Sequence, residues 1–222
     1  MRETSKSKAT WSDLELSVLQ GKGIDIGCGP DPVFETARRF DLEQGDANHI
    51  TRFVSDTFDY VYSSHCLEHM HNPPGALLEW WQLVKPGGYL FFVVPDEDLY
   101  EQGFFPSLFN GDHKATFTIR KDKSWSPVSY NVSDLASRLP NGKIIAIDLQ
   151  DFGYDRKLSF RGSGRPNWLV HKMHSAYAVL TTALRMKPTF LDSWVCRFHP
   201  IDQTRKPNTL AQIRCIVKKA TE

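Results

Sequence analysis

Residues 23–30, which read GIDIGCGP, constrain this chain more than any other part of its sequence. They form a short apolar run that ends in a Gly-x-Gly turn. Glycines in such a turn adopt backbone angles that other residues avoid, and they let backbone N–H groups approach a ligand closely. A dinucleotide-binding fingerprint needs a third glycine, but counting from Gly27 that position is Pro32. The carboxylate of Asp25 would also repel a pyrophosphate, so the motif favours a cationic ligand.

The first half of the chain alternates strand-like and helix-like segments, which predicts a mostly parallel sheet with crossover helices. The predicted strands are 23–26, 59–63, 89–94, 143–149 and 211–217. The predicted helices are 73–84, 132–139 and 170–187. We expect residues 1–10 to be a flexible lead-in and 11–222 to form one domain. Within it we expect a cofactor-binding half (22–95), substrate-side loops with an inserted helix and a sixth strand (96–209), and a last strand (210–219).

Composition narrows the function classes. The 222 residues are 41% hydrophobic and 24% charged, which suits a globular core and excludes a disordered chain or a coiled coil. Lys and Arg total 27 against 26 for Asp and Glu, so we expect no bulk nucleic-acid partner. The longest apolar run, residues 90–94, is too short to span a membrane. The polar N-terminus shows no secretory signal and the four cysteines form no CxxC pair, so a cytoplasmic protein is expected.

The chain resembles the class I S-adenosylmethionine-dependent methyltransferases. Their first motif is apolar–acidic–apolar–Gly-x-Gly-x-Gly, and IDIGCGPD matches it except at the last glycine, where Asp31 stands. Further segments that match in family order are FDLE (40–43), DA (46–47), FDYVYSS (58–64), LEHM (67–70) and LVKPGGYL (83–90). The resemblance covers about residues 22–95. It implies a Rossmann-like α/β fold, with a mostly parallel seven-stranded sheet flanked by helices and an elaborated C-terminal half. Only eleven residues separate Gly29 from Asp41, so the early helices are expected to be truncated.

The resemblance also implies the cofactor, S-adenosylmethionine, with S-adenosylhomocysteine as product. The backbone of residues 27–29 would pass along its methionine part, and Asp25 would orient the ammonium group, directly or through water. Asp41, or alternatively Glu43, would accept hydrogen bonds from the ribose hydroxyls. Asp46 would meet the adenine amino group. The implied cofactor-binding residues are Asp25, Gly27, Cys28, Gly29, Asp41, Leu42, Asp46, Ala47, Ser63 and Ser64, the last two beside the sulfonium.

Histidines near the predicted strand ends suggest the catalytic groups. An oxygen acceptor must lose its proton during methyl transfer, and histidine is the commonest base. His65 and His113 are therefore the candidate bases or substrate contacts.

The same region also resembles a metal site. The run from His65 through Glu68-His69, followed by a distant His113, is similar to the E-x-x-E-H…H metal site of small-RNA 2′-O-methyltransferases and ubiquinone-pathway O-methyltransferases. His65 replaces the first Glu of that pattern. A divalent ion at these four residues is thus an alternative to a metal-free site, in which an E-H pair serves for packing and hydrogen bonding.

These observations predict a methyltransferase that acts on a hydroxyl or carboxyl oxygen of a small molecule or glycan. Transfer to a nitrogen atom remains open, and so do two readings from other function classes. One is a catalytically silent S-adenosylmethionine-binding protein, and the other is a nicotinamide-dependent oxidoreductase.

Overall fold

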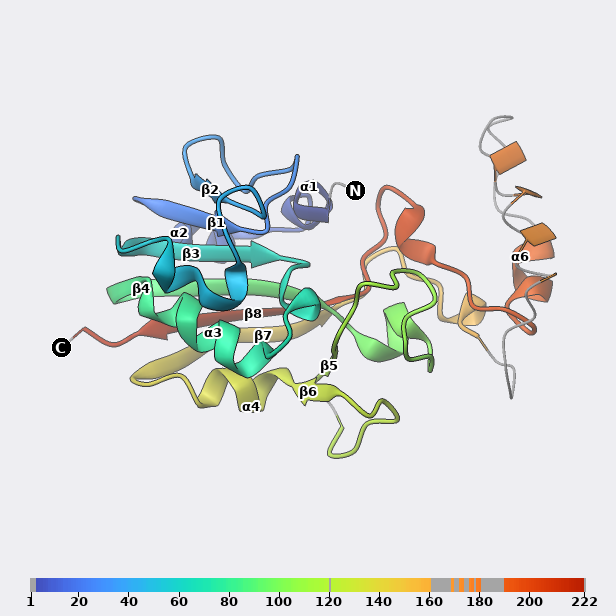
Figure 1. Ribbon diagram of the computed structural model, residues 1–222. Helices are drawn as coiled ribbons and strands as arrows, with labels where there is room; N and C mark the ends of the chain where they lie inside the picture. Colours follow the sequence, from blue (N-terminus) through green and yellow to red (C-terminus); the bar gives the residue numbers. More distant parts are fainter. Residues whose placement is uncertain are drawn as a thin grey trace.

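The computed structural model describes residues 3–119, 121–160 and 190–221, together with residues 169, 172–173, 176–177 and 179–180. Within these residues, a central six-stranded sheet has the order β2-β1-β3-β4-β8-β7 (Figure 1). Its strands are β1 (Gly23–Ile26), β2 (Arg38–Phe40), β3 (Phe58–Ser64), β4 (Val84–Pro95), β7 (Gly142–Gln150) and β8 (Gln212–Lys219). The pairs among β1 to β4 are parallel, and β8 is antiparallel to both of its neighbours. A separate parallel pair joins β5 (Thr116–Thr118) to β6 (Ser129–Asn131).

Short helices cover the sheet and connect its strands. The α-helices are α1 (Glu3–Lys8), α2 (Asp13–Val18), α3 (Pro73–Gln82), α4 (Val132–Ser137) and α6 (Phe190–Val195). Further helical segments are η1 (Ala47–Arg52), which is kinked at His49, η2 (Leu67–His69), η3 (Glu97–Glu101), η4 (Arg156–Leu158) and η5 (Gln203–Arg205). None of the helices among the described residues is long and apolar enough to cross a membrane.

Both faces of the sheet are buried, which gives a three-layer α/β/α arrangement. Along β4, Leu90 and Phe92 face the core shared with α3 and α4, while Phe91 and Val93 face the core shared with α2. This alternation follows from the period of two in a strand, and burial on both faces explains why the sequence of β4 is almost uniformly apolar. Trp80 of α3 is fully buried in the first core.

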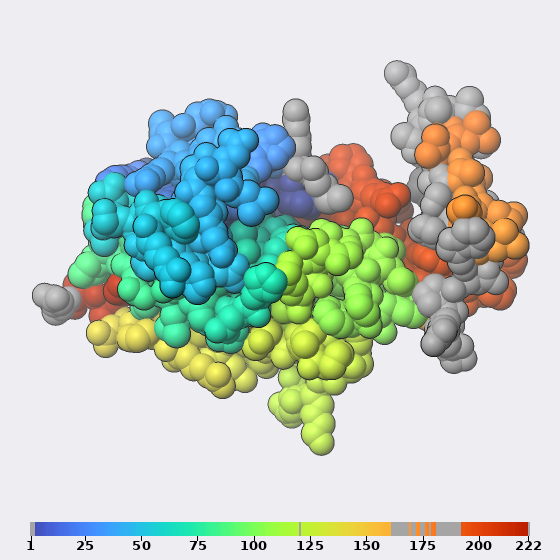
Figure 2. All heavy atoms as spheres, viewed as in Figure 1, coloured from blue at the N-terminus to red at the C-terminus, as the bar shows by residue number. Residues whose placement is uncertain are grey.

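The ends of α3 follow from its local sequence. The side chain of Asn72 accepts a hydrogen bond from the N–H of Gly75, and Pro73 occupies the first turn, where no backbone donor is needed. This helix places the preceding turn, with η2, at the carboxyl end of β3. As Figure 2 shows, green residues that follow β4 lie beside the blue and teal residues of the first half on the visible face.

The structure confirms the mostly parallel α/β fold and the five predicted strands. The expectation of seven strands is wrong for the central sheet, which has six in the described residues. The residues between Asp41 and Phe58 form a turn and η1, so no strand pairs with the outer edge of β2.

Residues 3–8 are also not a flexible lead-in, because they form α1 and bury the side chains of Thr4 and Ser7. Most of the predicted helix 170–187 lies outside the described residues.

Candidate functional site

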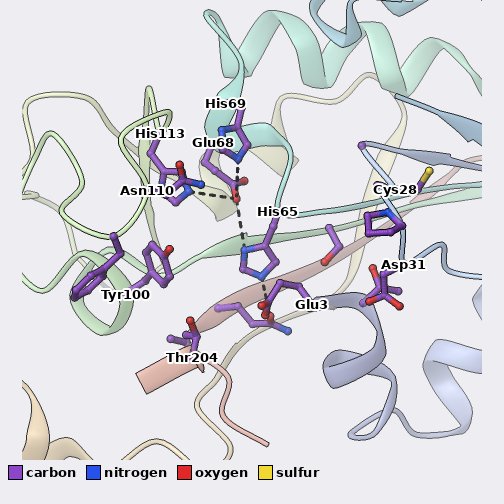
Figure 3. Close-up of a pocket in the computed structure, with 18 residues that line it drawn as sticks. Glu3, Cys28, Asp31, His65, Glu68, His69, Tyr100, Asn110, His113 and Thr204 are labelled. Carbon is purple, nitrogen blue, oxygen red and sulfur yellow. Dashed lines mark hydrogen bonds and ion pairs between the residues drawn. The ribbon is translucent and has the colours of Figure 1, made fainter. Parts of the chain in front are cut away.

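A pocket of about 250 Å³ opens at the carboxyl ends of β1 and β3 (Figure 3). Ligands of open α/β sheets bind at this edge, because the loops that leave parallel strands converge there. The lining residues are Glu3, Thr4, Gly27, Cys28, Gly29, Pro30, Asp31, Ser64, His65, Glu68, His69, Tyr100, Phe109, Asn110, His113, Thr204, Ala211 and Gln212.

The Gly-x-Gly turn forms one wall of this pocket. Gly27 has φ +73°, and a Cβ at this position would lie 2.5 Å from Sγ of Cys66. Gly29 has φ +51°, and its N–H donates to Oδ2 of Asp41 at 2.7 Å. The turn is therefore tight against the following loop at Gly27, and Asp41 holds it in shape at Gly29.

Asp25 does not line the pocket. Its side chain is 1% exposed, and Oδ2 accepts a hydrogen bond from the N–H of Val33 at 2.6 Å. Burial raises the pKa of Asp25 to about 7, and its second oxygen has no hydrogen-bond partner among the described residues. Asp25 thus lies beneath the Gly-x-Gly turn and not at the surface of the pocket.

Four more of the sequence-predicted cofactor residues lie just outside the pocket. Leu42, next to Asp41, is 89% exposed. Asp46 is exposed and caps η1, accepting from the N–H of Asn48, and Ala47 follows it. Asp46 borders a second hollow of about 250 Å³ with Asn48, His49, His71, Asn72, Gly75, Ala76 and Glu79.

The two serines at the end of β3 differ in their surroundings. The hydroxyl of Ser63 donates to the carbonyl of Ile26, so this residue ties β3 to β1 rather than lining the pocket. Ser64 lines the pocket, and its Oγ atom has no hydrogen-bond partner in the part of the chain that the structure describes.

Helix α1 closes the pocket opposite the histidines. Glu3 and Thr4 line it, and the Ser5 N–H donates to Oδ2 of Asp31 at 2.8 Å. The Ser5 hydroxyl donates to the other oxygen of Asp31 at 2.5 Å. The N-terminal helix is therefore attached to the same turn that the Gly-x-Gly motif predicted.

A buried carboxylate, Glu68, lies at the centre of three histidines (Figure 3). Its Oε1 atom is 3.5 Å from Nδ1 of His65, 4.0 Å from Nε2 of His69 and 3.9 Å from Nε2 of His113. Glu68 is 0% exposed, and neither of its oxygens has a hydrogen-bond partner among the described residues. His113 reaches this position because the N–H groups of Lys114 and Ala115 both donate to the carbonyl of Glu68.

Burial and the histidines act on the pKa of Glu68 in opposite directions. Burial disfavours its charged form, but His65, and then His113 and His69, hold the pKa of Glu68 below its ordinary value. For His65 itself, burial lowers the pKa and Glu68 raises it, and the net pKa is about 9. The two groups favour an ion pair at neutral pH.

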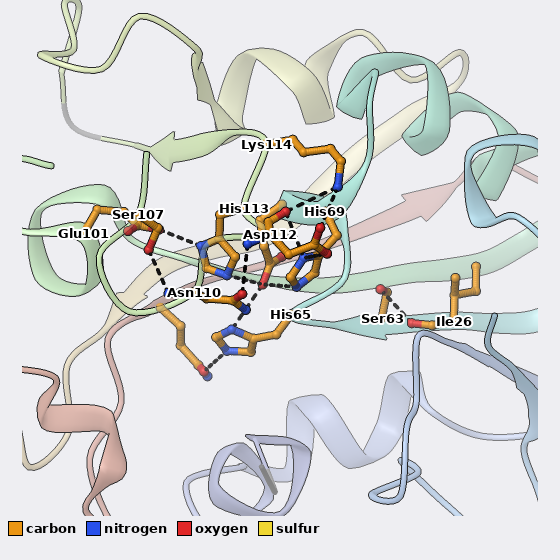
Figure 4. A network of polar contacts seen from close by, with 12 residues as sticks. Ile26, Ser63, His65, His69, Glu101, Ser107, Asn110, Asp112, His113 and Lys114 are labelled. Atoms are coloured by element: carbon orange, nitrogen blue, oxygen red, sulfur yellow. Dashed lines mark hydrogen bonds and ion pairs between the residues drawn. The ribbon is translucent and has the colours of Figure 1, made fainter. Parts of the chain in front are cut away.

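The outer nitrogens of the three histidines are held by acceptors (Figure 4). Nδ1 of His113 lies 2.6 Å from Oε1 of buried Glu101, and Nδ1 of His69 lies 2.9 Å from Oδ2 of Asp112. Nε2 of His65 lies 3.0 Å from Oε1 of Gln212.

The second nitrogen of each ring is therefore directed at Glu68. The ligand atoms of Glu68, His69 and His113 all lie within 4.8 Å of one another. Such a cluster, with carboxylates behind the imidazoles, has the chemistry of a divalent metal site.

The pocket brings together eight of the sequence-predicted residues: Gly27, Cys28, Gly29, Ser64, His65, Glu68, His69 and His113. It leaves outside Asp25, Asp41, Leu42, Asp46, Ala47 and Ser63. Sequence reasoning missed the α1 residues, Tyr100 and the outer partner Glu101. Asp112 stands directly before His113, so a search for carboxylates beside candidate ligands could have found it, whereas no local pattern marks Glu101.

Comparisons with known proteins agree with this arrangement. Residues 11–155 match the family model described as a methyltransferase domain. A curated relative is the ubiquinone biosynthesis O-methyltransferase of Pseudomonas putida strain F1, 24% identical over 120 residues that cover 41% of this chain and 52% of that protein. The chain thus spans about half the length of the curated relatives that it matches.

Two solved structures to which this chain is similar are both methyltransferases. A SAM-dependent methyltransferase from Archaeoglobus fulgidus is 15% identical, with a TM-score of 0.47, and 99% of this chain and 95% of that chain are covered. The plantazolicin methyltransferase BamL, solved with a substrate analogue and SAH, is 14% identical, with a TM-score of 0.48 and coverage of 97% and 84%.

The family match covers more than half of the chain and includes the Gly-x-Gly turn and the Glu68 cluster. It favours the methyl donor S-adenosylmethionine over a nicotinamide cofactor. The chain belongs to the methyltransferase domain family, the S-adenosylmethionine-dependent class I methyltransferases.

Proposed function

We propose that this protein transfers a methyl group from S-adenosylmethionine to an oxygen atom of a small-molecule acceptor, and that a divalent transition-metal ion assists the transfer. The observation that carries the proposal is the convergence of Glu68, His69 and His113 within 4.8 Å of one another, inside the pocket that the Gly-x-Gly turn also lines. Cofactor turn and histidine cluster thus face one cavity.

The cofactor is proposed to lie along the turn. The backbone of residues 27–29 is free to approach its methionine part, because nothing lies within 4 Å of a Cβ built at Gly29. Asp31 and Glu3 supply carboxylates at the pocket wall for the cationic end of the cofactor, while Asp25 acts from below by holding the N–H of Val33.

The adenosine is proposed to extend from Asp41 towards Asp46. Leu42, 89% exposed, offers an uncovered apolar surface for the adenine ring, and Ala47 with Asp46 lies at the far end. Burial of that side chain by the ring would remove apolar area from water.

The donor set fits a metal ion of borderline softness. Imidazole nitrogens with one carboxylate suit zinc, cobalt or nickel better than magnesium, which prefers oxygen ligands. Glu68, His69 and His113 would hold the ion, and His65 lies within reach of the same carboxylate. When bound, such an ion lowers the pKa of a coordinated hydroxyl and orients it.

The protein's own groups then align the reactants. Methyl transfer is an in-line displacement. The protein accelerates it by holding the acceptor oxygen and the methyl carbon in contact. Tyr100 and Phe109, whose rings meet edge to face at 5.6 Å, line the acceptor side with Asn110. An aromatic surface beside one amide suits a small acceptor that carries a ring.

The experiment is a methyl-transfer assay on chelator-stripped protein, with a panel of phenols, catechols, hydroxy acids and sugars, before and after zinc, manganese or cobalt is restored. The proposal predicts transfer to an oxygen acceptor that depends on the metal, and its loss in Glu68→Gln. Asp59→Asn is the matched control, since Asp59 pairs with Lys85 at the opposite end of β3. If Glu68→Gln does not fold, His69→Ala replaces it.

Two results would overturn the proposal. Cofactor binding without transfer to any acceptor would show a catalytically silent binding protein. Equal activity with and without metal would show that no metal ion assists the transfer. In that second case His65 or His113 would serve as a metal-free base.

A further inference from the structure

Gln212, the first residue of β8, connects the N-terminal helix to the histidine cluster. Its side chain is 1% exposed. The Nε2 atom donates to Oγ of Ser7 at 2.8 Å and to Oε1 of Gln150 at 2.7 Å. The Oε1 atom lies 3.0 Å from Nε2 of His65, a contact drawn as a dashed line from His65 in Figure 3.

The hydrogen-bond network fixes the direction of each bond. The hydroxyl of Ser7 donates its hydrogen to the carbonyl of Glu3 at 3.0 Å, so Oγ of Ser7 accepts from Gln212. Both hydrogens of the Gln212 amide are then used, one on Ser7 and one on Gln150. Its oxygen remains for His65, which must donate from Nε2.

This assignment decides which nitrogen of His65 carries hydrogen and which has the lone pair. With the hydrogen on Nε2, the lone pair of the neutral ring is on Nδ1, which lies 3.5 Å from Oε1 of Glu68. The other two rings follow the same rule. Asp112 and Glu101 accept from the Nδ1 atoms of His69 and His113, which leaves their Nε2 atoms for the cluster.

We propose that Gln212 is a positioning residue and that α1 orients it through Ser7, so that His65 presents Nδ1 to the Glu68 cluster as a further ligand. The proposal rests on the proposed function for the identity of the site. Helix α1 would then make two contacts that matter for the site, because it also bonds Asp31 of the cofactor turn through Ser5. The N-terminal helix then joins the cofactor side and the histidine side of the pocket.

The first test reads the ring nitrogens of His65 directly. Nitrogen-15 NMR of chelator-stripped protein distinguishes a nitrogen that carries hydrogen from one that carries a lone pair. We expect Nε2 of His65 to carry hydrogen, as its contact with the oxygen of Gln212 requires. A lone-pair signal at Nε2 would overturn the proposal, and this outcome does not depend on metal binding.

Variants separate positioning from general stability. Gln212→Met should leave His65 as a mixture of the two tautomers and weaken zinc affinity by about 10–100-fold, as loss of an outer partner does at other metal sites. Ser7→Ala is the second variant if Gln212→Met does not fold, and it should give the same mixture because the amide can then turn over. Gln203→Met is the matched control, because Gln203 is equally buried and its side-chain amide bonds the backbone of Asp155, away from the histidines.

The outcomes distinguish the two proposals. If wild type keeps hydrogen on Nε2 but binds no zinc, the metal-assisted function fails and the positioning role of Gln212 stands. If Gln212→Met and Gln203→Met give the same His65 spectrum as wild type, Gln212 does not position the ring.

Discussion

Glu101 and His113 form a buried pair, with Oε1 of the glutamate 2.6 Å from Nδ1 of the histidine. Both side chains are at most 3% exposed, so the contact is not shared with solvent. Because Glu101 accepts at Nδ1, the Nε2 atom of His113 is directed at Glu68. Glu101 and Glu68 thus lie on opposite sides of one imidazole.

Removing this outer carboxylate should weaken metal binding. We expect Glu101→Gln to lower zinc affinity by about 10–100-fold, because the ring loses its orientation and part of its basicity. Asp112→Asn should have a smaller effect, since the side chain of Asp112 is 68% exposed and water can replace it. Competition with a zinc indicator measures both, and an unchanged affinity in Glu101→Gln would argue against a metal at His113.

The two glycines of the turn should respond differently to alanine. In Gly27→Ala the new Cβ would lie 2.5 Å from Sγ of Cys66 at a positive φ, so we expect a loss of about 2–4 kcal/mol in the free energy of unfolding. In Gly29→Ala the Cβ meets open space, and only backbone strain of about 1–2 kcal/mol remains. Urea denaturation of both variants tests this order, and equal losses would contradict the crowding at Cys66.

Asp25 should make stability depend on pH. Burial raises its pKa from 3.8 to about 7, so the folded state favours the protonated carboxyl. Its stabilising protonation is complete below pH 4 and is lost as the pH rises through about 7, a change of about 4 kcal/mol at most. We therefore expect Asp25→Asn to gain stability over wild type at pH 8 but not at pH 4. Urea denaturation at both pH values measures the difference, and a constant difference would contradict the raised pKa.

Leu42 should contribute to cofactor binding without contributing to stability. Its side chain is 89% exposed in the structure, so Leu42→Ser should leave the unfolding midpoint unchanged. If the adenine ring covers it, affinity for S-adenosylhomocysteine should fall about 5–30-fold, the equivalent of about 1–2 kcal/mol of apolar burial. Leu16→Ser, at 46% exposure on α2, is the control that should bind normally. Equal affinity in both variants would place the adenine elsewhere.

Much of this fold could be predicted from local patterns. The apolar runs of β1, β3 and β4, and the Asn-Pro-Pro start of α3, specify their structure through neighbours in the sequence. Helix α1 could not be predicted in this way. Its sequence, ETSKSK, is polar, and it is fixed by distant partners, Asp31 through Ser5 and Gln212 through Ser7.

The histidine cluster likewise combines residues that local sequence patterns predict with one residue that they do not. His65, Glu68 and His69 lie close in the sequence, so their spacing alone made them candidates. The approach of His113 depends on backbone bonds from Lys114 and Ala115 to Glu68, which no local pattern reports. Asp25 matches the acidic position of the motif, but the motif does not say on which side of the turn its side chain lies.

The most direct test of the account is calorimetric titration with S-adenosylhomocysteine, on chelator-stripped protein and again after zinc is restored, with a separate titration of zinc itself. We expect micromolar binding of the nucleoside in both states and one zinc ion per chain, with the zinc lost in Glu68→Gln. Binding of the nucleoside without any zinc would leave a methyltransferase without a metal. No binding of the nucleoside in either state would contradict the central claim that this pocket holds the methyl donor.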